Sequence, residues 1–200
     1  MKRFSAITAA LIVVAVTIAG CGTSLYSEQW VALFDGTEAS LANWDRLGGA
    51  NWRIVDGSLQ ADKSTTKTIS NLVSKNSYKD FMIRAEFWVS EDANSGIYIR
   101  CTDAVKVSSA TAYEVNIFDT RPDPSYATGA IVGVAMVKNM PKAGGRWNTF
   151  EIYAKGPEMT IVMNGAVTVH GSDSRFPGGR IALQYGQGVV KFRKVEIKPL

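Results

Sequence analysis

The chain of 200 residues carries 22 Lys and Arg side chains against 18 Asp and Glu, which gives a net charge of +4, and 46% of its residues are hydrophobic. This near balance, with no block of Lys or Arg, excludes a surface built to follow nucleic-acid phosphates. The length suffices for one domain with a substantial core, which needs no disulfide to stabilise it.

The first 20 residues have the layout of a secretory signal. Lys2 and Arg3 precede an apolar stretch from Ala6 to Ala19. An uncleaved transmembrane helix is the alternative, but the stretch is shorter than the roughly 20 apolar residues that a bilayer requires. It ends in Ile-Ala-Gly-Cys, which resembles the bacterial lipobox. Cys21 is therefore the expected lipidated N-terminus of the mature protein, and Gly22 after it favours outer-membrane delivery.

These features predict residues 1–20 as a lipoprotein signal peptide, residues 21–29 as a tether, and residues 30–200 as a single β-sandwich domain. Loss of Lys2 and Arg3 leaves 20 basic against 18 acidic side chains, a net charge of +2. We expect an exported lipoprotein in the periplasm or outer membrane of a Gram-negative bacterium, held to the membrane through its N-terminal lipid only. Cys101 then has no disulfide partner and is expected to be a small buried hydrophobe.

Short apolar runs separated by turn residues recur from Trp30 onward, without a convincing amphipathic helix. Asp56-Gly57 and Asn164-Gly165 supply the positive φ angles of tight hairpin turns. Many short strands at about ten-residue spacing favour an all-β fold, a two-sheet antiparallel sandwich, with a barrel as the alternative.

Alternation of period two predicts which strand residues are buried. From Phe81 to Val89 the odd positions are apolar, so Trp88 is expected to face outward. The same rule places Ile97, Ile99 and Cys101 in the core, and Tyr98, Arg100 and Thr102 outside. In the last strand the apolar positions change parity between Phe192 and Val195, which predicts a one-residue bulge near residues 193–194.

The segment Tyr113–Asp119 holds the most chemistry. Glu114 and Asn116 share one face of a strand, and a bulge after Asn116 would bring Asp119 to the same side. The pattern resembles the Glu-x-Asp-x-x-Glu strand of laminarinase-like glycoside hydrolases, which have a jelly-roll sandwich. Their retaining mechanism needs carboxyls about 5 Å apart and a long general acid, and Asp119 is shorter. A solvated strand face is the alternative.

A second resemblance covers nearly the whole mature chain and is to the 3-keto-disaccharide hydrolase domain family. The matching segments are Leu33–Thr37 with Trp44, Trp52–Leu59, Tyr78–Phe81 with Arg84–Phe87, Asn94–Arg100, Tyr113–Asp119, Lys142–Ile152, and Ile181–Gln184 through Phe192-Arg193 to Lys198–Leu200. The family is similar in fold to the concanavalin A-like lectins and glucanases. The resemblance implies cleavage of glycosides oxidised to a ketone at C3, in which a base removes the C2 proton and the C1 substituent leaves, with water added afterwards.

On this resemblance Glu114 is the acid/base, Asp119 matches the family pattern, and Asn116 replaces the usual Gln. Arg100 and Lys142 are candidates to stabilise developing negative charge, with surface ion pairs as their alternative role.

Four further side chains are weighed for substrate binding. Tyr98 and Trp88 are candidates for stacking on sugar rings, or else for packing under a loop. Gln184 lies where the family has a polar site residue, whereas Trp147 is expected to be structural.

No cofactor is expected, although a hard divalent cation such as Ca or Mg is not excluded. The single His170, which we expect in a turn, rules out an imidazole-rich site. A cation would therefore need Glu114, Asp119 and carbonyl or amide oxygens.

Three functions remain open at this point: an enzyme acting on 3-keto-glycosides, a non-catalytic carbohydrate-binding module tethered to the membrane, and a lipid-tethered structural or partner-binding protein. The first two have a carbohydrate as partner. The third predicts an exposed apolar patch without polar groups.

Overall fold

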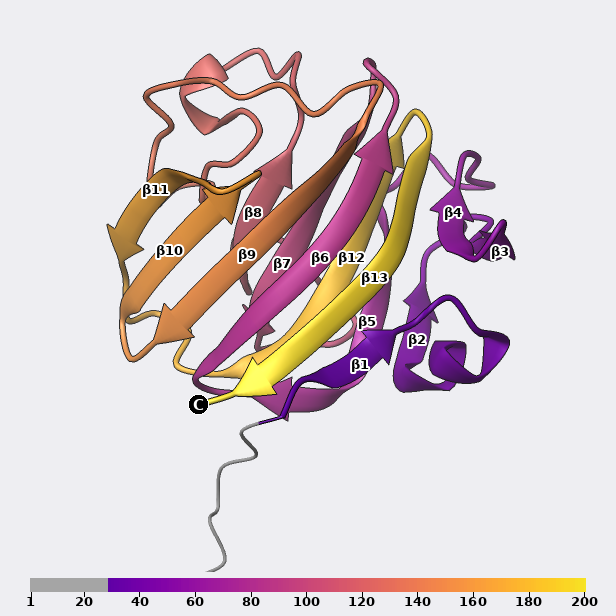
Figure 1. The fold of residues 1–200 in the computed structure, drawn as a ribbon, viewed down its shortest axis with the longest axis horizontal. Helices are drawn as coiled ribbons and strands as arrows, with labels where there is room; N and C mark the ends of the chain where they lie inside the picture. Colours follow the sequence, from indigo (N-terminus) through magenta and orange to yellow (C-terminus); the bar gives the residue numbers. More distant parts are fainter. Residues whose placement is uncertain (1–28) are drawn as a thin grey trace, which may run out of the picture.

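The computed structural model describes residues 29–200, which form two antiparallel β-sheets packed face to face (Figure 1). The strands of the larger sheet are β1 (Val31–Phe34), β3 (Arg53–Val55), β4 (Ser58–Ala61), β6 (Phe81–Val89), β9 (Trp147–Lys155), β10 (Glu158–Met163), β11 (Ala166–Ser172) and β13 (Val190–Pro199). Those of the smaller sheet are β2 (Trp44–Leu47), β5 (Ser70–Tyr78), β7 (Asn94–Cys101), β8 (Tyr113–Ile117) and β12 (Gly179–Gln187). The predicted sandwich is confirmed.

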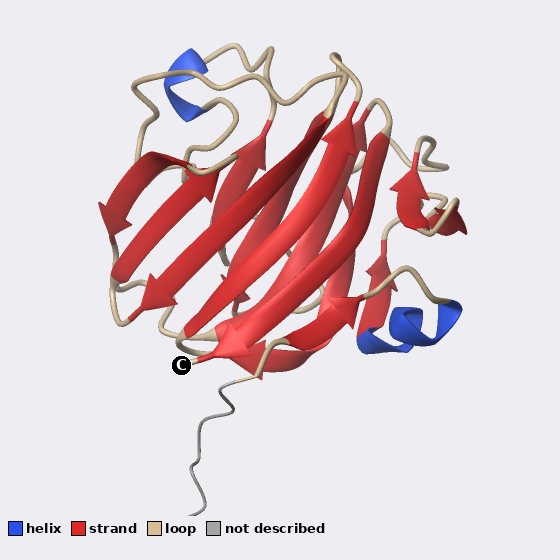
Figure 2. Cartoon of the chain, in the orientation of Figure 1, coloured by secondary structure: helices blue, strands red, loops and turns tan. Residues whose placement is uncertain are grey.

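The larger sheet has the order β11-β10-β9-β6-β13-β4-β3, with β1 also paired to β13, and the smaller sheet has the order β2-β5-β12-β7-β8. Two short 3-10 helices, η1 (Glu38–Asn43) and η2 (Pro124–Tyr126), lie in the connections outside the sheets (Figure 2). Consecutive strands therefore often lie in different sheets, and residues far apart in the sequence become neighbours.

The inner faces of the two sheets form the main core. The alternation predicted for residues 81–89 is confirmed, because the odd positions of β6 are all buried. Phe87 packs against Phe150 of β9 and Phe192 of β13, with ring centroids 4.8 and 6.5 Å apart. Such aromatic contacts add to the free energy gained by burying apolar surface.

Both predicted hairpin turns and the predicted bulge are confirmed. Asp56-Gly57 connects β3 to β4, and Asn164-Gly165 connects β10 to β11, all four residues having positive φ. In β13 the pairing with β6 shifts by one residue between Phe192 and Lys194. The shift lets the apolar residues on both sides of the bulge face the same core.

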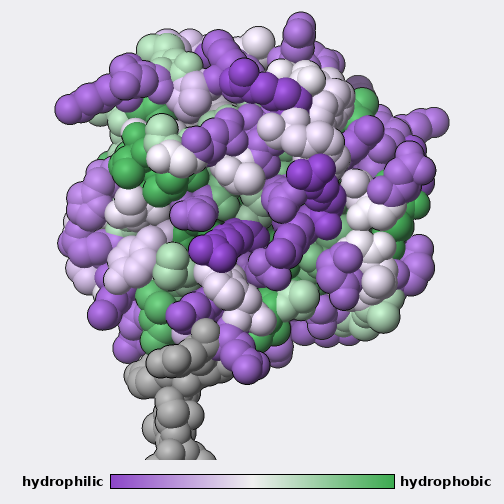
Figure 3. All heavy atoms as spheres, in the orientation of Figure 1, coloured by the Kyte–Doolittle hydropathy of each residue, from purple (hydrophilic) through white to green (hydrophobic). Residues whose placement is uncertain are grey.

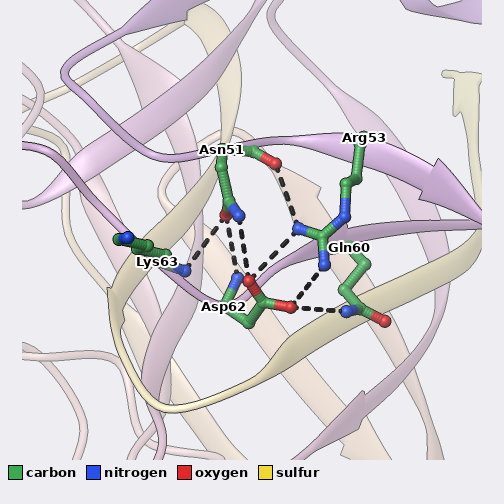
Figure 4. Close-up of polar contacts among 5 residues, drawn as sticks. All are labelled: Asn51, Arg53, Gln60, Asp62 and Lys63. Atoms are coloured by element: carbon green, nitrogen blue, oxygen red, sulfur yellow. Dashed lines mark hydrogen bonds and ion pairs between the residues drawn. The ribbon is translucent and has the colours of Figure 1, made fainter.

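A polar cluster fixes the chain beside the β3–β4 hairpin (Figure 4). The Asp62 carboxylate accepts hydrogen bonds from Asn51, Arg53 and Gln60, at 2.9, 2.5 and 2.7 Å for the shortest contact of each. These contacts, led by that with Arg53, hold the pKa of Asp62 far below its ordinary range. Asn51 Oδ1 accepts from the backbone amides of Asp62 and Lys63. The start of the connection to β5 is thereby held in place.

The alternation predicted for the end of β7 is wrong. Arg100 has a φ of +55°, which breaks the period of two, and its side chain is fully buried. Its guanidinium donates to the carbonyl oxygens of Lys79 (2.9 Å) and Gly156 (2.7 Å) and to Asp80 (3.2 Å). Cys101 instead packs with Tyr98 on the outer face of the smaller sheet. Arg100 thus joins the β5–β6 turn to the β9–β10 turn and has a structural role.

Two other single-residue expectations have different outcomes. Cys101 is buried as predicted, and burial raises the pKa of its thiol to about 12. The expectation that His170 lies in a turn is wrong. His170 belongs to β11, where it is exposed and contacts Glu158 (3.1 Å) and Thr160 (2.9 Å).

The predicted signal peptide, Cys21 and nearly all of the predicted tether lie outside the described residues, so these predictions stay as stated. Within residues 29–200, no helix combines the length and hydrophobicity needed to cross a membrane.

Replacement of Arg100 tests its structural role. We expect Arg100→Met to lower the free energy of unfolding by about 3 to 5 kcal/mol, because it removes the buried cation beside Asp80 and the donor of the carbonyl oxygens of Lys79 and Gly156. Urea denaturation measures the change. Arg84→Met is the matched control, since Arg84 is half-exposed beside Glu151 and an exposed pair contributes about 1 kcal/mol or less. Equal stability of the two variants would contradict the assignment.

Candidate functional site

The register of three neighbouring strands brings the candidate site together on the outer face of the smaller sheet. Tyr98 of β7 lies directly opposite Glu114 of β8 and, on its other side, opposite Ala182 of β12. Ile97 and Val115, the next residues along the two strands, belong to the main core. Successive strand residues face opposite sides, so Tyr98 and Glu114 point away from the core.

Glu114, Tyr98 and Gln184 form a hydrogen-bonded trio on this face, which we call the carboxyl trio. Gln184 Nε2 donates to Glu114 Oε1 at 3.1 Å and to the Tyr98 hydroxyl at 3.0 Å. The three residues are only 7, 3 and 1% exposed, respectively. The sequence predicted all three as site residues, and the structure brings them into contact.

Burial governs the protonation of the trio. Removal from water raises the pKa of Glu114, and hydrogen bonds from Gln184 and Tyr98 and the charge of Arg121 offset part of this rise. Burial and the neighbouring Glu114 raise the pKa of the Tyr98 hydroxyl far above its ordinary value. Tyr98 therefore stays a hydrogen-bond donor at neutral pH, and Glu114 is a stronger base than an exposed carboxylate.

Asn116 shares the face of Glu114, as the strand period predicted. It is fully buried, and its Nδ2 donates to the carbonyl oxygen of Tyr126 at 2.6 Å. Its Oδ1 has no hydrogen-bond partner. The amide nitrogen thus fastens η2 to the sheet and the amide oxygen is left unpaired.

Asp119 and Lys142 contact each other and the loop before β9, not the carboxyl trio. The Asp119 carboxylate accepts from the Thr128 hydroxyl (2.6 Å) and from the amides of Ala143 and Gly144 (both 2.9 Å at the nearer oxygen). Lys142 Nζ donates to the Asp119 carbonyl oxygen at 2.7 Å. The bulge considered after Asn116 does not occur in the paired residues of β7 and β8, whose register is continuous.

Trp88 lies on the other sheet. It belongs to β6 and is half-buried on the outer face of the larger sheet, where Lys191 Nζ stands 5.0 Å from the centre of its ring. Its cross-strand neighbour Trp147 has Arg193 over its ring at 4.4 Å. Figure 3 shows this side of the molecule, where hydrophilic residues prevail around small apolar areas. Trp88 is thus separated from the carboxyl trio by the core.

The residues considered for a hard cation are not assembled into a ligand set. Across residues 29–200, no three His, Cys, Asp or Glu side chains come close enough together to hold a metal ion. The oxygens of Asp119 accept hydrogen bonds from a hydroxyl and two amides.

Sequence reasoning missed Asn71, Gly96 and Arg121. Asn71 is buried on the outer face beside Gln184, and Gly96 lies between Gln184 and Asn116. Polar-apolar alternation does not reveal the face of Asn71, because the next two residues, Leu72 and Val73, are both apolar. Arg121 follows β8 in an irregular segment, and no pattern in the sequence indicates its nearness to Glu114.

Residues 29–198 match the family described as the 3-keto-alpha-glucoside-1,2-lyase-like domain. The chain belongs to this family. The family resemblance that the sequence motifs indicated is thereby confirmed. Among curated proteins, none matches the chain.

Solved structures show the same fold. Two crystal structures of Parabacteroides distasonis proteins, provisionally named glycosyl hydrolases, superpose with TM-scores of 0.72 and 0.69 at 19 and 23% identity. Each match covers 86% of this chain, and 95 or 100% of the other chain. The carbohydrate-binding module CBM66 from Bacillus subtilis has a TM-score of 0.62 at 17% identity, over 78% of this chain and 95% of its own. At such identities the likeness shows a shared sandwich.

The pH dependence of stability tests the burial of Glu114. Its folded-state pKa lies above the ordinary value of 4.5, so the folded state binds this proton more tightly than the unfolded state does. This contribution to stability is full below pH 4.5 and is lost as the pH rises through the raised pKa. We expect Glu114→Gln to remove that decline. Urea denaturation between pH 4 and 8 measures it, and a decline of the same size in both proteins would contradict the assignment.

Proposed function

We propose that the domain cleaves glycosides whose ring carries a ketone at C3, with Glu114 as the base that removes the C2 proton. The observation that carries the proposal is the buried Glu114 carboxyl, held by Gln184 and Tyr98 on the outer face of the smaller sheet. Membership of the 3-keto-alpha-glucoside-1,2-lyase-like family supports this choice of substrate.

The proposed reaction requires one base rather than the two carboxyls of ordinary glycosidases. Glu114 takes the C2 proton, and the electrons of that C–H bond form the enolate with the C3 oxygen. The enolate then expels the C1 substituent, which leaves with its bonding electrons and gains a proton, and a C1–C2 double bond forms. Addition of water to this double bond completes a net hydrolysis. Asp119 does not join the carboxyl trio, and this route does not require a second carboxyl there.

Arg100 and Lys142, the residues that the sequence indicated for stabilising the enolate, are bonded elsewhere. Arg100 is engaged with Lys79, Gly156 and Asp80, and Lys142 with Asp119. In the proposal the Tyr98 hydroxyl, which donates to Glu114 in the free protein, turns to the enolate oxygen once Glu114 holds the C2 proton. Arg121, whose charge acts on Glu114, balances the negative charge.

Product analysis tests this function. We expect the mature protein to cleave a 3-keto-disaccharide but not the unoxidised sugar, and Glu114→Gln to reduce kcat/KM by about 10²-fold or more because the base is lost. The rate should rise with pH through a pKa above 4.5, since only ionised Glu114 accepts the proton.

Glu151→Gln is the matched control, because Glu151 is an exposed residue of β9 on the other sheet. It should retain the full rate. Binding of both sugars without cleavage would reject the enzyme and favour the second candidate, a non-catalytic carbohydrate-binding module that uses the same face.

We also propose that lipid on Cys21 holds the protein to the membrane of the cell envelope. The lipobox-like sequence before Cys21 supports this. A mature N-terminus that lacks lipid, measured by mass spectrometry, would contradict it.

A further inference from the structure

Four neighbouring strands of the smaller sheet carry a straight row of residues next to the carboxyl trio. The row consists of Asn71 on β5, Gln184 on β12, Gly96 on β7 and Asn116 on β8, each paired with the next across the sheet. All four lie on the outer face, because Leu72, Leu183, Ile97 and Val115, which follow or precede them, face the main core. We call these four residues the amide row.

Each of the three amide side chains in the row has an unpaired oxygen. Asn71 Oδ1, Asn116 Oδ1 and Gln184 Oε1 are closed off from solvent and have no hydrogen-bond partner, and the three residues are 2% exposed or less. Two of the amides are fixed in orientation, because their nitrogens donate to Glu114 and to Tyr126. An unpaired buried acceptor costs free energy, so three on one face need an explanation.

Gly96 lies at the centre of the row, where the surrounding atoms leave little space for a side chain. A methyl group at this position would lie 3.5 Å from Gln184 Oε1, 3.5 Å from Glu114 Cγ and 3.1 Å from the carbonyl oxygen of Val115. The backbone of Gly96 does not have the positive φ that would demand glycine. A side chain at this position would therefore crowd both the unpaired oxygen and the proposed base.

The chemistry of the row selects its ligand. Amide oxygens accept hydrogen bonds and cannot donate them, so the ligand must present hydrogen-bond donors, which on a sugar are its O–H groups, and not a carbonyl oxygen. A hexose unit with a ketone at C3 keeps hydroxyl groups at C2, C4 and C6. With C2 placed at Glu114, the hydroxyl groups that remain for the row are those at C4 and C6. The ketone oxygen has to face Tyr98 instead.

We propose that the amide row is the subsite that binds the free C4 and C6 hydroxyl groups of the oxidised ring, with Asn71 and Gly96 as specificity-determining residues. The inference rests on the proposed function. A ligand reaches the row by displacing irregular segments, since Ala104 and Val107 pack over the neighbouring apolar residues and Tyr126 bonds to Asn116.

Asn71→Leu separates ligand binding from structure. Leu has a similar shape and removes an unpaired oxygen, so we expect unchanged or higher thermal stability. We expect KM for the 3-keto-disaccharide to rise about tenfold because one hydrogen bond to the substrate is lost. We expect kcat to stay within about twofold of the wild-type value. Asn76→Leu, at an exposed position of the same strand, should leave KM unchanged. Lower stability with unchanged KM would overturn the proposal.

Two further measurements keep the test independent of the first variant. Gly96→Ala should also raise KM by about tenfold or more, because its methyl group occupies the space of the ring, and an unchanged KM would overturn the proposal. A 4,6-di-O-methyl analogue keeps both oxygens and loses both donors. It should bind the wild type more weakly than the parent sugar, and this difference should shrink in Asn71→Leu.

The proposed function can fail separately. If no sugar is cleaved, calorimetry with the unoxidised disaccharide still tests the row, and weaker binding by Asn71→Leu would support it. If the keto sugar is cleaved and neither variant changes KM, the proposed function stands and the amide row is rejected as a subsite.

Discussion

The pairing of β7 with β8 and β12 is the constraint on which the candidate site depends. It sets Tyr98 opposite Glu114 and places Gln184 within hydrogen-bond distance of both. A slip of one residue in either pair would turn Glu114 or its partners into the core. The core residues Ile97, Val115 and Leu183, on the opposite face of the same strands, oppose such a slip because it would expose them.

The outer face of the smaller sheet buries polar groups instead of exposing them. Segments outside the strands cover it, with Ala104 and Val107 packed over Tyr98, Cys101 and neighbouring residues. Burial makes Glu114 a stronger base, and it leaves amide oxygens unpaired at a cost in stability. Sites that bind ligands commonly carry such a cost. The anchoring of the chain by Arg100 and Asp119 elsewhere supplies stability without touching the trio.

The sequence predicted what the strand period controls. The face shared by Glu114 and Asn116, the alternation of β6 and the bulge in β13 all follow from parity. Parity failed at Arg100, where a positive φ reverses the side chain. It also says nothing about which sheet a strand joins, which is why Trp88 was grouped with Tyr98 although the core lies between them. Asn71 was missed because Leu72 and Val73, which follow it, are both apolar, so the strand period does not separate the two faces there.

The central claim is that the oxidised sugar binds on the outer face of the smaller sheet with C2 against Glu114. A crystal structure of the Glu114→Gln protein with a 3-keto-disaccharide measures this directly. The account predicts the oxidised ring over Gly96, with its C2 hydrogen toward residue 114 and its C4 and C6 hydroxyl groups on the amide row. A ring bound on the larger sheet, beside Trp88 and Trp147, would contradict it.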